Sequence, residues 1–114
     1  TNYDVVRTMS PILVKKDGMK LTCNDDGWVD ILTDNCVKKL KHSGIVDDTF
    51  RIVVGNKDKI HSKIVMVGDI FNPCTEGIFM VYGKRSTREV LYNSGLGNST
   101  GSGFGAIRIL KKNR

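Results

Sequence analysis

The sequence has few prolines and no long hydrophobic run, and each shortage excludes a class of protein. Two prolines in 114 residues, with 39% apolar and 26% charged residues, exclude a disordered or proline-rich chain. No apolar run approaches the roughly 20 residues of a membrane-spanning helix, and no N-terminal block resembles a secretion signal. We therefore expect one globular domain over residues 1–114, located in the cytoplasm and without a membrane partner.

Cysteine and histidine are also scarce. Cys23, Cys36 and Cys74 are odd in number and widely spaced, and the two histidines are His42 and His61. This spacing matches neither a disulfide framework nor a Cys/His metal site. The sequence therefore predicts free thiols in a reducing compartment, with no metal and no cofactor.

The order of hydrophobic patterns predicts an α+β domain. One helical pattern follows Asn24 or Asp25 as N-cap, buries Trp28 on its apolar face and ends at Gly44. A second helix opens with a capping box at residues 86–89 and runs to about Asn93. Strands are expected at residues 5–15, 20–22, 50–54, 60–70, 77–82 and 104–110. Any two of the runs 50–54, 60–70 and 77–82 can form the central pair, and we take 60–70 with 77–82. The resulting βαββαβ order is typical of a ferredoxin-like (RRM-like) domain with an antiparallel sheet.

A glycine-rich run near the C-terminus is the strongest candidate for function. It begins Gly95-Leu96-Gly97, continues with five small residues and ends Gly103-Phe104-Gly105. Glycine backbone can approach a ligand closely and turn its N–H groups toward an anion, whereas Leu96 and Phe104 can pin the loop onto a core. A flexible linker is the alternative. The candidate phosphate-binding residues are Gly95, Gly97, Asn98, Ser99, Thr100, Ser102, Gly103 and Gly105.

The charge balance agrees with a polyanionic partner. The formal net charge is +6 and the pI is near 9.4. A solvated basic surface is the alternative, but two basic clusters flank the glycine-rich loop in sequence. They comprise Lys84, Arg85 and Arg88 before the loop, and Arg108, Lys111, Lys112 and Arg114 after it. Of these, Lys84, Arg85, Arg88 and Arg108 join the predicted RNA-binding set.

The loop and three other segments carry a family resemblance. The loop has two Gly-hydrophobic-Gly triplets separated by five residues, and it precedes the last strand. This pattern resembles the C-terminal signature of the RAMP superfamily, and more narrowly that of the CRISPR repeat endoribonucleases. Residues 9–14, 21–26 and 92–97 resemble other segments of the second domain of those proteins. The likeness covers nearly the whole chain, but about half of a typical member. It implies a ferredoxin-like fold and CRISPR repeat RNA as the partner.

No catalytic residue is predicted. The family reaction is metal-independent RNA cleavage through the 2′-hydroxyl, and its histidine commonly lies in the first domain, to which nothing here corresponds. His42 ends a helix, and His61 lies in a basic strand where it can contact phosphate. Tyr82 and Tyr92 can each present a ring to a base, yet the aromatic strand motif of an RNA-recognition motif is missing. The sequence therefore favours a domain without catalysis of its own, and does not predict base stacking across the sheet.

Two functions follow from these features. In the first, the chain holds CRISPR RNA through its glycine-rich loop and basic rim. In the second, it is a free-standing mimic, plausibly viral, that inhibits by contacting a CRISPR effector protein. A homodimer is a further way to complete a two-domain arrangement. Thr1 is compatible with removal of an initiator methionine, which would make the chain complete, but a piece of a longer protein could begin in the same way.

Overall fold

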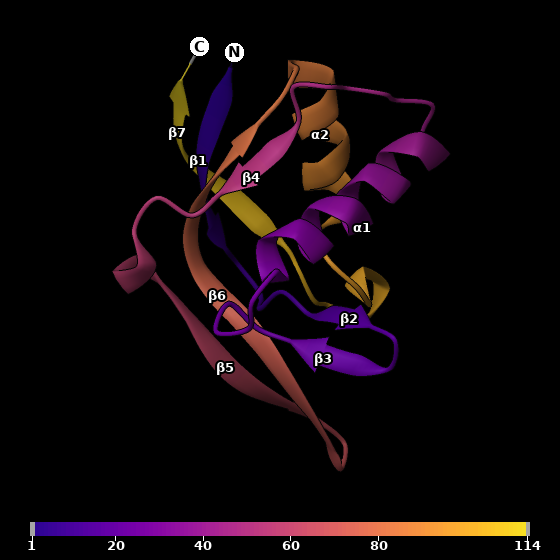
Figure 1. The fold of residues 1–114 in the computed structure, drawn as a ribbon, viewed down its shortest axis with the longest axis vertical. Coiled ribbons are helices and arrows are strands. Elements are labelled where there is room, and N and C mark those ends of the chain that lie inside the picture. Colours follow the sequence, from indigo (N-terminus) through magenta and orange to yellow (C-terminus); the bar gives the residue numbers. More distant parts are fainter. Residues whose placement is uncertain (1, 114) are drawn as a thin grey trace.

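The computed structural model describes residues 2–113. It consists of an antiparallel sheet with both helices on one face (Figure 1). The strands lie in the order β4–β6–β1–β7, and β5 pairs with an extension of β6. The main elements are β1 (Tyr3–Thr8), α1 (Trp28–His42), β4 (Arg51–Val53), β6 (Ile70–Tyr82), α2 (Arg85–Ser94) and β7 (Ile107–Asn113). This order confirms the predicted ferredoxin-like fold.

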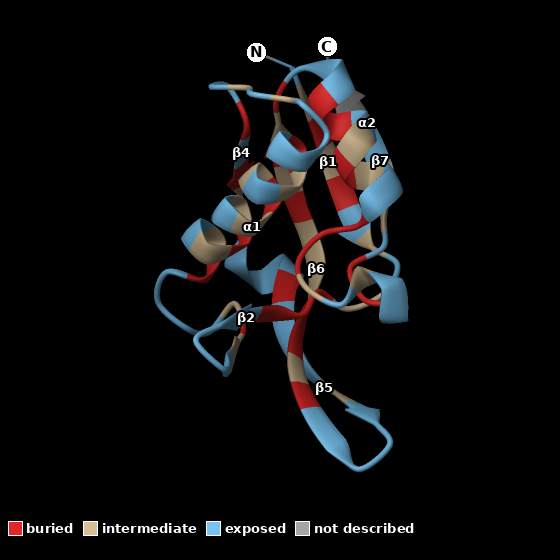
Figure 2. Cartoon of the chain, turned by 90° about the vertical axis from the view of Figure 1, so that its right-hand side faces the viewer, coloured by how far each residue is buried: buried red, intermediate tan, exposed pale blue. Residues whose placement is uncertain are grey.

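The core fills the space between the helices and the sheet (Figure 2). Alternate residues of β6, Phe79 and Val81, face the helices because side chains alternate along a strand. Leu32 and Leu40 meet them from α1, at helical spacing. Trp28 is 2% exposed, which confirms its predicted core position.

The start of α1 differs from the prediction. Gly27, in the left-handed region at φ 79°, is the N-cap, and no side chain caps this helix end. Asp25 instead accepts a hydrogen bond from the backbone N–H of Thr22 at 2.7 Å and closes the preceding turn. The helix ends as predicted, since Gly44 takes φ 76° and Ile45 N–H bonds back to the Leu40 carbonyl.

The start of α2 also differs from the prediction. The helix begins at Arg85, before the expected capping box, and Ser86 does not cap it. The cap comes from Asp47, whose Oδ2 accepts from the backbone N–H of Lys84 at 2.8 Å and the hydroxyl of Thr87 at 2.7 Å. A carboxylate from a distant loop therefore satisfies this helix end.

The predicted strand 5–15 is two separate elements. β1 ends at Thr8, and the chain bends at Ser10 before β2 (Val14–Lys16). β2 pairs with β3 (Met19–Leu21) through a turn in which Asp17 and Gly18 both have positive φ, a geometry that matches a two-residue hairpin. Pro11 lacks an N–H, so this position suits a break between strands.

The expected pairing of strand 60–70 with strand 77–82 is wrong. β5 (Ile60–Val67) pairs with the first half of β6, and the 77–82 half of β6 lies between β4 and β1. β6 runs without a break through Pro73. Thr75 exchanges both backbone hydrogen bonds with Ile12, so the alternation of the strand points the Pro73 backbone to the same edge, away from β5.

The last strand begins three residues later than predicted, at Ile107. Phe104 and Gly105 belong to the glycine-rich loop, which also contains the short 3₁₀ turn η2 (Thr100–Ser102). A second 3₁₀ turn, η1 (Lys57–Lys59), precedes β5. Among residues 2–113, neither helix has the length and apolar character needed to cross a bilayer.

Candidate functional site

Two apolar anchors hold the glycine-rich loop on the domain. Leu96 is fully buried in the main core, and Phe104 is 7% exposed in a smaller cluster with Leu13 and Cys74. The two Gly-hydrophobic-Gly triplets therefore act as stems. This confirms the prediction that Leu96 and Phe104 pin the loop onto a core.

Backbone hydrogen bonds tie the stems to each other and to the segment after β1. The N–H of Leu96 donates to the Gly105 carbonyl, and the N–H of Gly105 donates to the Pro11 carbonyl, each at 2.9 Å. Asn98 N–H donates to the Leu13 carbonyl at 2.7 Å. In return, the Asn98 side-chain oxygen accepts from the N–H of Lys15 at 2.8 Å. The loop is consequently a fixed structure and not a flexible linker.

The stem glycines are needed for contact with the protein itself. A β-carbon on Gly97 would overlap the Leu13 carbonyl oxygen, and one on Gly105 would overlap the Leu96 carbonyl oxygen. Both residues also have positive φ. Their lack of a side chain is therefore explained by packing, whereas the sequence suggested close approach to a ligand. A bulky residue at Gly97 is therefore expected to disturb the fold as well as any ligand contact.

The tip of the loop faces solvent. We define the loop tip as residues 98–103, in which Ser99, Gly101, Ser102 and Gly103 are exposed. Within the tip, the N–H groups of Ser102 and Gly103 close the η2 turn onto Ser99 and Thr100. A β-carbon on Gly101 or Gly103 would meet nothing within 4 Å. The tip is thus a small, polar and unobstructed surface on a rigid base.

Two lysines that the sequence did not assign to the site lie at the loop. Lys15 is exposed beside the tip, because its backbone is bonded to Asn98. Lys39, from α1, donates from Nζ to the Gly95 carbonyl at 3.1 Å. Burial lowers the pKa of the Lys39 ammonium, and the nearby Cys36 opposes that shift. The sequence held no signal for these contacts, because 83 and 56 residues separate the partners.

Lys84 and Arg85 are not brought to the loop. They lie at the N-terminal end of α2, and the loop leaves from its C-terminal end. A ten-residue helix is about 15 Å long, so proximity in sequence does not give proximity in space here. Arg85 pairs with Glu89 at 3.0 Å on the exposed face of the helix.

Arg88 is in the interior and not at the loop surface. Its guanidinium lies 2.7 Å from the Asp4 carboxylate and donates to the Gly83 carbonyl. Tyr92 donates its hydroxyl to the same carboxylate at 2.7 Å, and burial together with Asp4 raises the pKa of Tyr92. The expectation that Arg88 faces a ligand therefore does not match its position, and the Tyr92 hydroxyl is already used.

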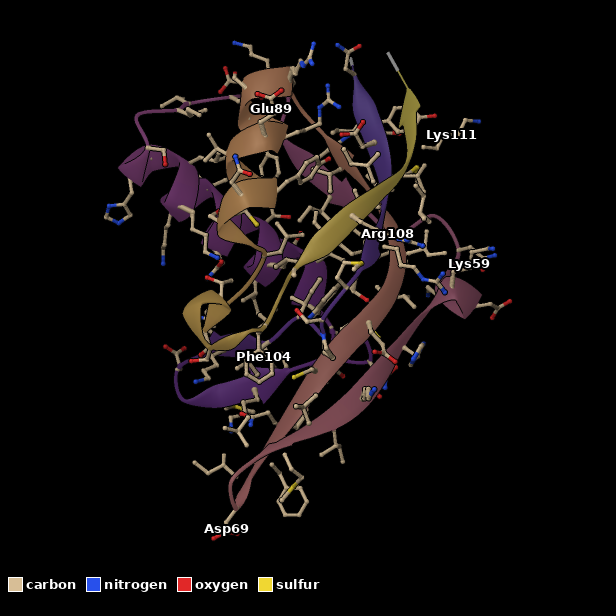
Figure 3. All side chains as sticks on the ribbon, turned by 180° about the vertical axis from the view of Figure 1, so that it is seen from behind. Lys59, Asp69, Glu89, Phe104, Arg108 and Lys111 are labelled. Carbon is tan, nitrogen blue, oxygen red and sulfur yellow. The ribbon has the colours of Figure 1, made fainter. Side chains whose placement is uncertain are left out.

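Arg108 is exposed on β7, close to the C-terminal stem of the loop. Lys111 follows it on the same strand, and both are labelled in the rear view of Figure 3. Arg114 and Thr1 lie outside the described residues, as does the side chain of Lys112.

The histidines do not assemble an acid–base centre with a nucleophile. His42 is exposed at the end of α1. His61 Nε2 lies 2.9 Å from Glu76, which also faces Lys63 at 3.8 Å, in an exposed cluster on the β5–β6 hairpin. Within residues 2–113, no three His, Cys, Asp or Glu side chains come together as metal ligands.

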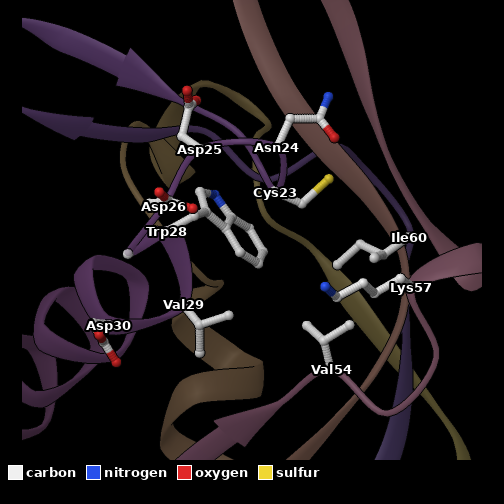
Figure 4. Close-up of a pocket in the computed structure, with 11 residues that line it drawn as sticks. Cys23, Asn24, Asp25, Asp26, Trp28, Val29, Asp30, Val54, Lys57 and Ile60 are labelled. Carbon is white, nitrogen blue, oxygen red and sulfur yellow. The ribbon is translucent and has the colours of Figure 1, made fainter.

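A cavity of about 490 Å³ lies between the start of α1 and the segment that leads into β5 (Figure 4). Its centre is apolar, with the Trp28 ring facing Val54 and Ile60. Three carboxylates lie along one rim and Lys57 lies opposite. That rim would repel a polyanion, so the cavity is separate from the loop site. The rim carboxylates are Asp25, Asp26 and Asp30.

A family model matches almost the whole chain. The model described as CRISPR associated protein Cas6, C-terminal, matches residues 1–109. No curated protein matches the sequence.

Solved structures share the fold. A structure described as CRISPR associated protein Cas6 aligns with a TM-score of 0.77 at 24% identity, over 95% of this chain and 48% of that chain. A Cas6-related protein from Pyrococcus furiosus aligns with a TM-score of 0.76 at 25% identity, over 99% and 50%. A structure described as an RAMP protein binding different RNA substrates gives 0.77 at 25% identity, over 97% and 50%. The chain thus spans about half the length of these structures.

Proposed function

The chain belongs to the family of the Cas6 C-terminal domain, and on that premise we propose that it binds CRISPR repeat RNA through the loop tip. The structural relative described as binding different RNA substrates supports RNA as the ligand. The net charge of +6 agrees with a polyanion.

One observation carries the proposal: the loop has locked stems and an open tip. Leu96 and Phe104 are buried, while Ser99, Gly101, Ser102 and Gly103 between them are small and exposed. Rigid placement avoids the entropic cost of ordering a loop on binding. Small residues let a phosphate approach the backbone, and the hydroxyls of Ser99 and Ser102 are donors of the kind that contact phosphate and sugar oxygens. Lys15 adds a cation beside them.

The test is the affinity for a fluorescently labelled CRISPR repeat RNA, measured by anisotropy. Gly101→Glu places one negative charge at the tip without steric overlap, and Gly101 has no positive φ that would strain it. We expect at least about tenfold weaker binding, since the added carboxylate repels a phosphate whose binding releases counterions in the wild type. Ser86→Asp is the matched control, because it adds the same charge at the exposed far end of α2. Equal affinity of Gly101→Glu and the wild type, at equal stability, would refute the proposal.

A second candidate function rests on the apolar tip of the β5–β6 hairpin. Ile64 and Phe71 are 62% and 64% exposed there, and Met66 is 51% exposed. An exposed apolar patch favours a protein contact, as expected for a mimic that docks on a CRISPR effector protein. Size-exclusion chromatography of the chain with purified CRISPR effector proteins tests this. Complex formation abolished by Ile64→Ser/Phe71→Ser would support the second function, and the absence of any complex would contradict it.

A further inference from the structure

The face of the sheet that the helices leave open carries a second set of chemical groups. Side chains alternate along each strand, so Val6 and Phe79 point to the helices and their neighbours point to the open face. The strand register places Arg7 of β1 directly opposite Arg108 of β7, and Val5 opposite Lys111. This surface is distinct from the loop tip.

Arg7 and Arg108 form a like-charge pair. Directly opposed side chains on antiparallel strands have β-carbons about 5 Å apart, and like charges in that position repel. Both residues are exposed, and within residues 2–113 neither one is in an ion pair. Glu76 lies further along the same face, but His61 and Lys63 already pair with it. The pair is therefore an unneutralised positive centre.

An aromatic stack lies on the same face. The rings of Tyr3 and Tyr82 are 4.8 Å apart with an interplanar angle of 28°, and the Arg51 guanidinium lies 4.4 Å over the Tyr82 ring. The residues between this stack and the arginine pair are half-buried and apolar. They are Val5, Val53, Ile78 and Met80.

We propose that the open face binds an unpaired stretch of RNA, with bases on the outer face of the Arg51 guanidinium and on the apolar centre, and with phosphates on Arg7 and Arg108. The proposal rests on RNA being the ligand of the chain, as proposed for the loop tip. Unstacked bases bind aromatic and arginine surfaces, whereas a duplex keeps its bases inside and has a major groove too narrow for a sheet. A single strand therefore matches the alternation of apolar and cationic groups.

The two RNA surfaces are adjacent. Thr8 pairs with Ile107 next to the arginine pair, and the N–H groups of Met9 and Ser10 donate to the Ala106 carbonyl at the loop stem. One strand of RNA can therefore pass from the loop tip to the open face. The same backbone hydrogen bonds fix the spacing between the two surfaces.

The experiment measures binding of a labelled 12-nucleotide uridine RNA, which has no base pairs. In Arg7→Gln/Arg108→Gln, we expect at least about tenfold weaker binding and a salt slope smaller by about 1.4, because each phosphate that an arginine neutralises adds about 0.7 to the slope. Arg51→Leu should weaken binding by roughly fivefold or more, since a base can no longer stack on the guanidinium. Lys38→Gln/Lys41→Gln is the control, because it removes two exposed charges from α1. A 12-base-pair RNA duplex should compete poorly.

The outcomes separate the two proposals. Gly101→Glu should weaken binding of the uridine RNA less than Arg7→Gln/Arg108→Gln does, because it leaves the open face unchanged, while it weakens binding of the repeat RNA by at least about tenfold. Wild-type affinity in the arginine double variant, no binding of uridine RNA by the wild type, or equal competition by the duplex would each overturn the open-face proposal. These results leave the loop-tip proposal untouched, because that proposal is tested by binding of the repeat RNA to Gly101→Glu. Thermal unfolding of every variant shows that loss of binding is not loss of fold.

Discussion

Arg88 and Asp4 form a buried ion pair that joins α2 to β1. The guanidinium Nη1 and carboxylate Oδ2 lie 2.7 Å apart, and the two side chains are 8% and 2% exposed. The Tyr92 hydroxyl donates to the same Oδ2 and Arg88 Nε donates to the Gly83 carbonyl, whereas Asp4 Oδ1 is buried without a hydrogen-bond partner among residues 2–113. Paired charges in this position hold the helix at one height on the sheet. The loop that follows α2 therefore leaves it at a defined place.

Loss of one partner of this pair should destabilise the fold strongly. Arg88→Met leaves the Asp4 carboxylate buried and unpaired, which should cost about 3–5 kcal/mol of unfolding free energy. Urea denaturation measures it. Arg85→Met removes the exposed pair with Glu89 and should cost less than about 1 kcal/mol. A similar loss of unfolding free energy in the two variants would show that the buried ion pair stabilises the fold no more than the exposed one.

The Asp47 cap predicts a stability that depends on pH. Burial alone would raise the pKa of Asp47, but hydrogen bonds from Thr49, Lys84 and Thr87 outweigh burial and hold it well below its usual range. Because the folded pKa lies below the unfolded one, the stabilisation is present above about pH 4 and is lost as the pH falls below that value. Asp47→Ala should cost about 1 kcal/mol at pH 7, and the difference from wild type should shrink toward pH 2. Asp48→Ala, at the exposed neighbour, should show no such convergence.

The glycines of the loop should differ in what they tolerate. Gly97→Ala and Gly105→Ala force a β-carbon into a carbonyl oxygen at positive φ, so each should lower stability by about 2 kcal/mol or more. Gly101→Ala should change it by less than about 0.5 kcal/mol, because its β-carbon meets open space. Differential scanning calorimetry distinguishes the two groups. Equal tolerance at all three positions would contradict the locked-stem description.

The thiols should react in a fixed order. Burial raises the pKa of Cys36 to about 12, against the smaller opposing effects of Lys39 and the Gly97 N–H, and burial also raises the pKa of Cys74. Cys23 is only half-buried. With iodoacetamide at pH 8, mass spectrometry should show Cys23 modified first and the other two protected until denaturant is added. Rapid modification of Cys36 in the native protein would show that its surroundings open readily.

The chain alone should not cut a CRISPR repeat RNA at a defined site. Neither His42 nor His61 lies in an arrangement that places a base at a ribose hydroxyl, and Glu76 occupies Nε2 of His61. The assay is incubation with labelled repeat RNA in chelator, with His61→Ala in parallel. Products ending in a 2′,3′-cyclic phosphate that disappear in the variant would identify His61 as the base.

Local patterns in the sequence predicted local features well. Gly44 ends its helix, and Leu96 and Phe104 anchor the loop, because these properties depend on neighbouring residues. The predictions that failed concern residues whose interaction partners are distant in sequence. Asp47 caps a helix 37 residues later, and Arg88 is withdrawn from the surface by an aspartate on the first strand. No hydrophobic period or capping motif encodes such contacts.

The pairing of the central strands failed for a related reason. β6 serves two partners in succession, β5 along its first half and β4 and β1 along its second. A sequence pattern shows that residues 70–82 favour a strand, but not that it extends from the sheet into a hairpin. The gap between the predicted strands 60–70 and 77–82 contains Pro73, which disfavours a central strand, but β6 continues through it because the Pro73 backbone points away from β5.

Because the stems are fixed and the tip is open, the sequence of the tip can be exchanged while the stems stay in place. Every backbone hydrogen bond that holds the loop to the domain lies at or before Asn98 or after Gly103, so the exposed residues Ser99 and 101–103 can change without the loss of any of these bonds. Recognition could then diversify among homologues, or be rewritten by grafting, without renewed selection for folding. In such a protein, ligand preference and thermal stability are free to evolve independently.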